Sequence, residues 1–176
     1  GSVTCELTFG LDKPCVGWLL GDVHDGIHQM FRVLEDARMT IGSKSAATLS
    51  TAYLNALAYA KERIQSADLT ATRDPLAPRV AIIRHPDVRR MLMEQKALAE
   101  GMRALTMYSA WVLDQVILHP DDKSWSKLSA LLLPLVKGYC SERAYDLVAQ
   151  CLQVLGGSGF TTDYPFEQYI RDLKID

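Results

Sequence analysis

The chain has 176 residues, of which 48% are hydrophobic and 23% charged, and its formal net charge is −2. This length is sufficient for one domain with a hydrophobic core. The near-neutral charge argues against a nucleic-acid-binding protein, which would carry a basic excess on one face. No apolar run approaches the roughly 20 residues that a membrane span requires. The four cysteines show no Cys-x-x-Cys spacing, so we expect reduced, mostly buried thiols and a cytoplasmic location.

Residues 3–20 are predicted to form two short β strands. The stretch VTCELTFG alternates apolar and polar side chains, PCVGWLLG is a second apolar run, and the Asp-Lys-Pro between them indicates a turn. Two strands do not make a stable sheet by themselves. We therefore interpret residues 1–22 as the remnant of a β domain, with Gly1 and Ser2 as a scar of tag removal.

The hydrophobic period becomes helical from about Ile27. Apolar residues recur at spacings of three, four and seven as far as Ile64, which predicts one helix of about 40 residues. Residues 67–86 contain three prolines, which argue against a helix in this segment. Within this break the apolar piece VAIIR is expected to dock on the core.

Three further helices are predicted from the same periodicity. Their ranges are 86–119, about 121–156 and about 165–175. Pro134 lies inside the second of these and should kink or split it. The predicted fold is mainly α, an up-down helical bundle over residues 23–176 that is truncated before its end, preceded by the two strands.

Two conventional catalytic arrangements find little support in the sequence. His24 and His28 are four residues apart with Asp22 and Asp25 nearby, but they fall at a glycine-rich junction and the sequence contains no His-Glu-x-x-His pattern. We therefore expect a solvated helix entry and no metal. The sequence contains no Gly-x-Ser-x-Gly motif, which argues against a serine nucleophile.

The stretch CLQVLGGSGF, residues 151–160, places three glycines after a helical run. The known phosphate-binding glycine loops follow a strand and open a helix, so the first interpretation is a helix C-cap at Gly156. One left-handed residue suffices to end a helix. Gly157 and Gly159 therefore indicate clearance for another backbone segment or a ligand.

Two long stretches together resemble the acyl-CoA dehydrogenase family. Residues 19–65, LLGDVHDGIHQMFRVLEDARMTIGSKSAATLSTAYLNALAYAKERIQ, are similar to the family's last β strand and the first helix of its C-terminal domain. Residues 151–175, CLQVLGGSGFTTDYPFEQYIRDLKI, are similar to its glycine turn followed by Tyr-Pro and Arg-Asp-x-Lys-Ile. The long segment 67–86 resembles larger bacterial members. By this resemblance, residues 1–22 would come from the family's middle β domain.

The resemblance implies an FAD-dependent enzyme that oxidises acyl-CoA thioesters between Cα and Cβ. In the family a glutamate removes the α proton and the flavin accepts hydride. That glutamate is expected a few residues beyond Asp176. The chain would therefore contribute no catalytic residue of its own and would be inactive alone, without retaining FAD.

The resemblance also assigns roles to individual residues. The FAD contacts are expected at Arg63, Gln65, Gln153, Gly156 and Gly157, with the cofactor belonging to a partner subunit. Glu35 and Arg38 are expected near the CoA and acyl entrance. Ser66 replaces an aromatic residue common in the family, which leaves adenine packing there in doubt. Arg38 and Arg63 lie 25 residues apart, close to seven helical turns, so both can face one side.

The expected partners are acyl-CoA, a second copy of the chain in a dimer or tetramer, and an electron-accepting flavoprotein. No nucleic acid and no membrane span are expected. An alternative remains open: a non-catalytic helical module for oligomerisation or interaction. Flavin absorbance together with sedimentation would discriminate the two.

Overall fold

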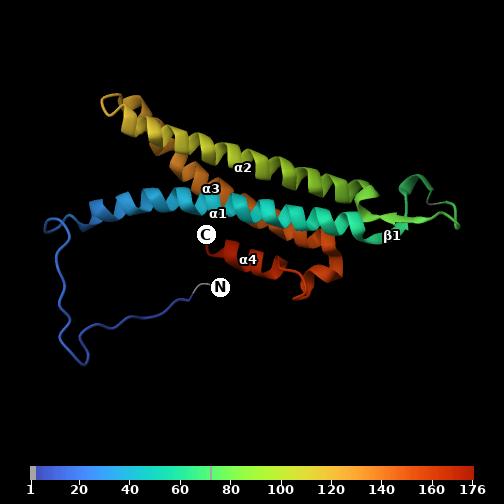
Figure 1. Ribbon diagram of the computed structural model, residues 1–176, viewed down its shortest axis with the longest axis horizontal. Coiled ribbons are helices and arrows are strands. Elements are labelled where there is room, and N and C mark those ends of the chain that lie inside the picture. Colours follow the sequence, from blue (N-terminus) through green and yellow to red (C-terminus); the bar gives the residue numbers. More distant parts are fainter. Residues whose placement is uncertain (1–2, 72) are drawn as a thin grey trace.

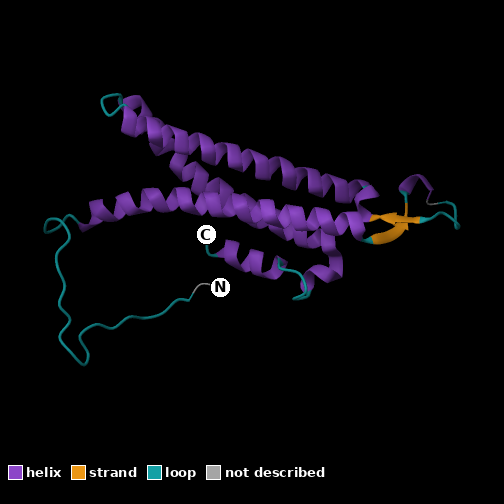
Figure 2. Ribbon diagram, viewed as in Figure 1, coloured by secondary structure: helices purple, strands orange, loops and turns teal. Residues whose placement is uncertain are grey.

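A computed structural model describes residues 3–71 and 73–176. Three long helices run side by side and a short fourth helix lies against them (Figures 1 and 2). The helices are α1 (Gly26–Glu62), α2 (Pro86–Leu118), α3 (Lys123–Leu155) and α4 (Phe166–Lys174). Strands β1 (Ile64–Ala67) and β2 (Arg79–Ala81) form an antiparallel pair at one end of the bundle. The predicted helical bundle is confirmed.

The position of the predicted strands was wrong. The described residues from Val3 to Asp25 form neither strand nor helix, and their side chains are largely exposed, with Val3 90% and Trp18 89% accessible. An extended pair needs further strands or a packed face to satisfy its hydrogen bonds and bury its apolar side, and neither is present. The two strands instead lie within the proline-containing segment after α1. The domain boundary after residue 22 stays a prediction.

Small residues on α1 allow α3 to approach it closely. The buried positions of α1 are mostly glycine, serine and alanine, with Leu49 among them. At Gly42 a Cβ atom would lie 2.9 Å from the carbonyl oxygen of Val136 and would clash with its side chain. Such a distance is too short for a carbon–oxygen contact, so glycine is required where the two helices cross.

The helix boundaries follow from local chemistry. Pro86 occupies the first turn of α2, where a missing N–H costs nothing. The Asp122 carboxylate accepts a hydrogen bond from the backbone N–H of Ser124 at 2.9 Å and caps α3. A hydrogen bond from the Ser124 side chain, followed by this backbone bond, lowers the pKa of Asp122. Contrary to one predicted outcome, Pro134 does not split α3, which continues to Leu155.

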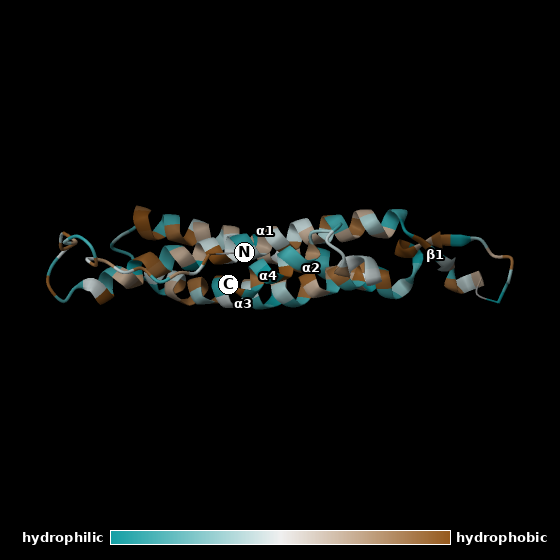
Figure 3. Ribbon diagram, turned by 90° about the horizontal axis from the view of Figure 1, so that it is seen from below, coloured by the Kyte–Doolittle hydropathy of each residue, from teal (hydrophilic) through white to brown (hydrophobic). Residues whose placement is uncertain are grey.

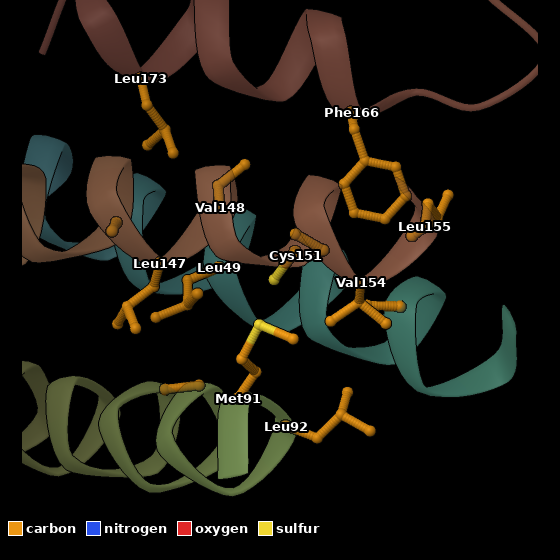
Figure 4. Close-up of a cluster of buried hydrophobic side chains, with 14 of the residues drawn as sticks. Leu49, Met91, Leu92, Leu147, Val148, Cys151, Val154, Leu155, Phe166 and Leu173 are labelled. Atoms are coloured by element: carbon orange, nitrogen blue, oxygen red, sulfur yellow. The ribbon is translucent and has the colours of Figure 1, made fainter. Parts of the chain in front are cut away.

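Helix α4 closes the bundle by inserting apolar side chains toward α3. Phe166 is fully buried and Leu173 is 3% exposed. Figure 4 shows Phe166 and Leu173 descending from α4 toward Val148 and Leu155, with Met91 of α2 on the opposite side of α3. Burying a phenylalanine side chain contributes about 1.5–3 kcal/mol. This packing fixes α4 in place beside the C-terminal half of α3.

The outside of the bundle also carries apolar side chains. Figure 3 shows hydrophobic positions distributed along the long helices, and Leu54, Met107 and Ile117 are among those that are exposed. An aromatic group near the junction of α2 and α3 is half exposed: Trp111 stacks on Tyr108 at 5.8 Å and meets Trp125 edge-on at 5.4 Å. Large exposed apolar patches are typical of interfaces.

Candidate functional site

An open cavity of about 1450 Å³ lies where α1 ends, the β hairpin begins and α3 ends. Its lining comes from segments about 90 residues apart in the chain. All five residues that the sequence analysis proposed for cofactor contact line this cavity: Arg63, Gln65, Gln153, Gly156 and Gly157. Tertiary folding therefore brings the two proposed segments to one place.

Arg63 and Gln65 are positioned by the transition from helix to strand. The Arg63 backbone N–H donates to the Tyr59 carbonyl at 2.9 Å, which completes the last turn of α1, and its own carbonyl accepts from Ile82 N–H at 2.8 Å. The Gln65 carbonyl bonds the His85 Nε2 at 2.8 Å. With their backbones bound in this way, both side chains remain exposed at the cavity. An arginine guanidinium in such a position can bind phosphate through two parallel hydrogen bonds.

Gln153, Gly156 and Gly157 form the opposite wall. Gly156 adopts φ +58 and ψ −136 directly after the last residue of α3, and its N–H donates to the Gln153 carbonyl. This is a left-handed φ that favours glycine, so the predicted helix stop at Gly156 is confirmed. A Cβ atom on Gly157 would have no heavy atom within 4 Å. Gly157 therefore leaves open space at the cavity wall.

Gly159 has a different role from the clearance that the sequence suggested. It is buried within the short 3₁₀ helix η3 (Gly156–Phe160). A Cβ atom here would lie 2.7 Å from the Leu152 carbonyl oxygen and 2.9 Å from Leu152 Cγ. The missing side chain makes room for the chain's own last turn of α3, and no ligand is needed to explain it.

Several residues of the cavity were not identified from the sequence. The Tyr59 hydroxyl donates to Ser158 Oγ at 3.1 Å and joins the end of α1 to η3, while its ring meets Tyr164 edge-on. Arg79 adds a second guanidinium to the lining. Tyr59 could have been found, since it precedes Arg63 by one helical turn. Arg79 could not, because the pairing of β2 with β1 brings it to the cavity.

Ser66 also lines the cavity, and its backbone is unusual. It adopts φ +59, a conformation that residues other than glycine rarely take. The hydroxyl is small, so this position offers no flat surface on which a ring could stack. Ser66 therefore adds little apolar surface to this wall.

Glu35 and Arg38 lie far from the cavity, in the first half of α1. Twenty-five residues of helix separate Arg38 from Arg63, which corresponds to about 37 Å. Glu35 lines a smaller cavity of about 580 Å³ together with His28 and Arg32. The structure therefore does not bring these two residues together with the five described above.

The described parts of the chain contain no group of three or more histidine, cysteine or acidic side chains arranged to hold a metal ion. Burial raises the pKa of the Cys140 thiol and raises that of Cys151 to about 12. Neither thiol is a reactive nucleophile at neutral pH, because the reactive form is the thiolate.

Within the described residues, none of the helices has the length and apolar character that a membrane-crossing segment needs.

These features define a helical-bundle domain with an open polar cavity between its helix ends. The family described as "Acyl-CoA dehydrogenase, C-terminal domain" matches residues 24–176. The chain belongs to the acyl-CoA dehydrogenase family and corresponds to the C-terminal domain of its members.

Curated relatives match nearly the whole chain. Broad-specificity linear acyl-CoA dehydrogenase FadE5 of Mycobacterium tuberculosis (strain ATCC 25618 / H37Rv) is 58% identical over 99% of the chain. A butyryl-CoA dehydrogenase of Syntrophomonas wolfei is 37% identical over the same share. In both comparisons the chain spans 30% of the relative's length.

A solved structure confirms the fold at lower sequence identity. Butyryl-CoA dehydrogenase from Megasphaera elsdenii superposes with a TM-score of 0.69 at 19% identity, over 88% of this chain and 35% of that one. A structure described as an electron transferring flavoprotein of Acidaminococcus fermentans gives a TM-score of 0.71 at 22% identity, with the same coverage.

Proposed function

We propose that this chain is part of an FAD-dependent acyl-CoA dehydrogenase that oxidises linear acyl-CoA thioesters between Cα and Cβ. The observation that carries the proposal is the common cavity, in which residues 63–65 face residues 153–157. The fold brings these two segments to one cavity, which supports a single binding site formed by both.

The cavity residues fit a dinucleotide cofactor. Arg63 and Arg79 supply positive charge for a pyrophosphate, and Asp74 is the one carboxylate among the described residues that line the cavity. The Gln153 amide can donate and accept hydrogen bonds, and Gly157 leaves open space for a close approach. When bound, FAD would supply the hydride acceptor; this chain's residues would bind and orient it. The cofactor would come from a partner subunit, as the resemblance implies.

Glu35 and Arg38 are proposed to serve the substrate. Arg38 is half-buried on α1 and carries a fixed positive charge, and Glu35 is exposed less than one helical turn before it. This acid–base pair would lie at the entrance for the CoA and acyl groups. The catalytic glutamate is expected beyond Asp176.

A homo-oligomer and an electron-accepting flavoprotein are the proposed protein partners. The apolar aromatic group of Tyr108, Trp111 and Trp125 supports an interface on this chain. The same observation favours the second candidate function, a helical interaction module without catalysis. A tight oligomer that contains no flavin would support that second function.

The test uses the natural full-length protein. Arg63→Gln removes the guanidinium at the cavity, and Arg89→Gln removes an exposed arginine from the first half of α2 as a matched control. We expect Arg63→Gln to weaken FAD binding by about ten-fold or more, since a hydrogen bond to a charged group contributes about 1.5–3 kcal/mol. Arg89→Gln should leave flavin content unchanged. Equal flavin content in both variants would contradict the cofactor assignment. Absence of acyl-CoA-dependent dye reduction by the wild type would contradict the enzymatic function.

A further inference from the structure

Asp176 lies at a junction of three helices that the cofactor cavity does not include. Its side chain is 1% exposed, and Lys44 of α1 donates to its Oδ1 at 2.6 Å. The Ser45 hydroxyl, also on α1, lies 3.3 Å from its Oδ2 and 2.9 Å from the Ile41 carbonyl, and its one proton is shared between these two acceptors. The residue directly follows Ile175, which caps α4. A buried carboxylate therefore attaches the end of α4 to α1.

The donors of this junction are held in place by the close crossing of α1 and α3. At the crossing a Cβ atom on Gly42 would lie 2.9 Å from the Val136 carbonyl oxygen, so the two backbones pass closely. Lys44 follows Gly42 by two residues on α1, and Lys137 follows Val136 directly on α3. Lys137 donates to the Asp176 carbonyl at 2.7 Å, and Lys44 also donates to the Asp172 carbonyl at 3.1 Å. Two lysines on different helices thus bind both the backbone and the side chain near the end of α4.

The ion pair at Asp176 differs from the other ion pairs of the described residues. In the other ion pairs of the described residues both side chains are at least 23% accessible, as in Lys96 and Glu100 with 58% and 65%. Such pairs contribute little to stability. At Asp176 the carboxylate is removed from water, so loss of Lys44 would leave a buried charge with only a hydroxyl partner. These contacts hold the last residues of α4 and Asp176 against α1 and α3.

We propose that Asp176, held by Lys44 and Ser45, is a positioning residue for the chain that follows α4. This inference rests on the proposed function, in which that following chain carries the proton-abstracting glutamate. The glutamate must meet the substrate α carbon within hydrogen-bond distance. A small displacement of the end of α4 would move it out of reach, and misplacement of a reacting group by about 1 Å can cost on the order of 100-fold in rate.

The experiment compares Lys44→Met, Lys44→Arg and Asp176→Asn in the natural full-length protein, with Lys96→Met as matched control. We expect Lys44→Met and Asp176→Asn to lower kcat on the order of 10- to 100-fold, with KM and flavin content unchanged. Lys44→Arg should restore most of kcat, and Lys96→Met should behave as wild type. Amide hydrogen exchange at residues 170–176 and in the residues that follow should become faster in Lys44→Met.

Two results would overturn the inference. The first is unchanged hydrogen exchange in Lys44→Met, because the junction would then hold nothing in place. The second is faster exchange with unchanged kcat, because the ion pair would then stabilise without positioning. An inactive wild-type protein would refute the proposed function separately. In that case faster exchange in Lys44→Met would still support anchoring of the chain by Asp176.

Discussion

Gly159→Ala should lower the stability of the fold and Gly157→Ala should leave it nearly unchanged, because Gly159 is buried and Gly157 faces the cavity. A Cβ atom on Gly159 would lie 2.7 Å from the Leu152 carbonyl oxygen, whereas ordinary contacts begin at 3.4 Å. The oxygen belongs to the last turn of α3 and cannot rotate away. Overpacking of this kind costs about 1–3 kcal/mol. For a chain of this size, each kcal/mol lowers Tm by about 2–4 °C.

Gly157→Ala is the matched control for stability. No heavy atom lies within 4 Å of the added Cβ, and the backbone of Gly157 does not have a positive φ. We therefore expect a change within about 0.5 kcal/mol, as for other exposed substitutions. Thermal unfolding of the 176-residue chain, followed by circular dichroism at 222 nm, measures both variants. Equal Tm values for Gly159→Ala and Gly157→Ala would refute the assignment of Gly159 to internal packing.

The larger variant Gly157→Val tests the cavity itself. In the natural full-length protein it should reduce FAD retention while the melting temperature changes little. The valine side chain would fill space that Gly157 leaves open beside Gln153. Loss of stability with unchanged flavin affinity would instead make this loop only a helix cap.

Three further predictions concern the core, the thiols and a helix cap. Gln95→Met should be neutral or stabilise by about 1 kcal/mol in urea unfolding, because both polar atoms of Gln95 are buried without partners; a loss of stability would point to a bound water. A thiol reagent at pH 8 should label the two exposed cysteines rapidly and the two buried ones only on unfolding, which mass spectrometry resolves: Cys5 and Cys15 against Cys140 and Cys151. The hydrogen bonds from Ser124 lower the pKa of Asp122 below 3.8, so its stabilisation is present above that pH and is lost as the pH falls through the folded-state pKa. The stability difference between wild type and Asp122→Asn should therefore shrink toward pH 3; a difference that grows on acidification would contradict the cap.

The cavity and the Asp176 junction divide the bundle into two regions. The cavity lies at the end of α1, where helix ends leave backbone groups and side chains open to a ligand. The junction lies near the crossing at Gly42, where small residues bring helices together and the Asp176 carboxylate is buried. The cavity is open to a ligand, whereas the junction holds the end of α4 in a fixed arrangement.

The sequence by itself determined the helices and most of their ends. Hydrophobic periodicity is a local property, and Pro86, Asp122 and Gly156 stop or start helices through their own backbone chemistry. The class of fold and the five cavity residues therefore followed from pattern and resemblance. The strands did not, because alternation in residues 3–20 indicates an extended chain only if other strands are there to pair with it.

Only the tertiary structure decided which residues meet. The Lys44–Asp176 ion pair joins positions 132 residues apart. No spacing in the sequence predicts this pair, whereas the exposed pairs along α2 are close in sequence. The same holds for Arg79, which reaches the cavity through strand pairing, and for Gly159, whose role depends on its distance from Leu152. Long-range packing selects among many contacts that are locally equivalent. For that reason the helices could be predicted and the junctions between them could not.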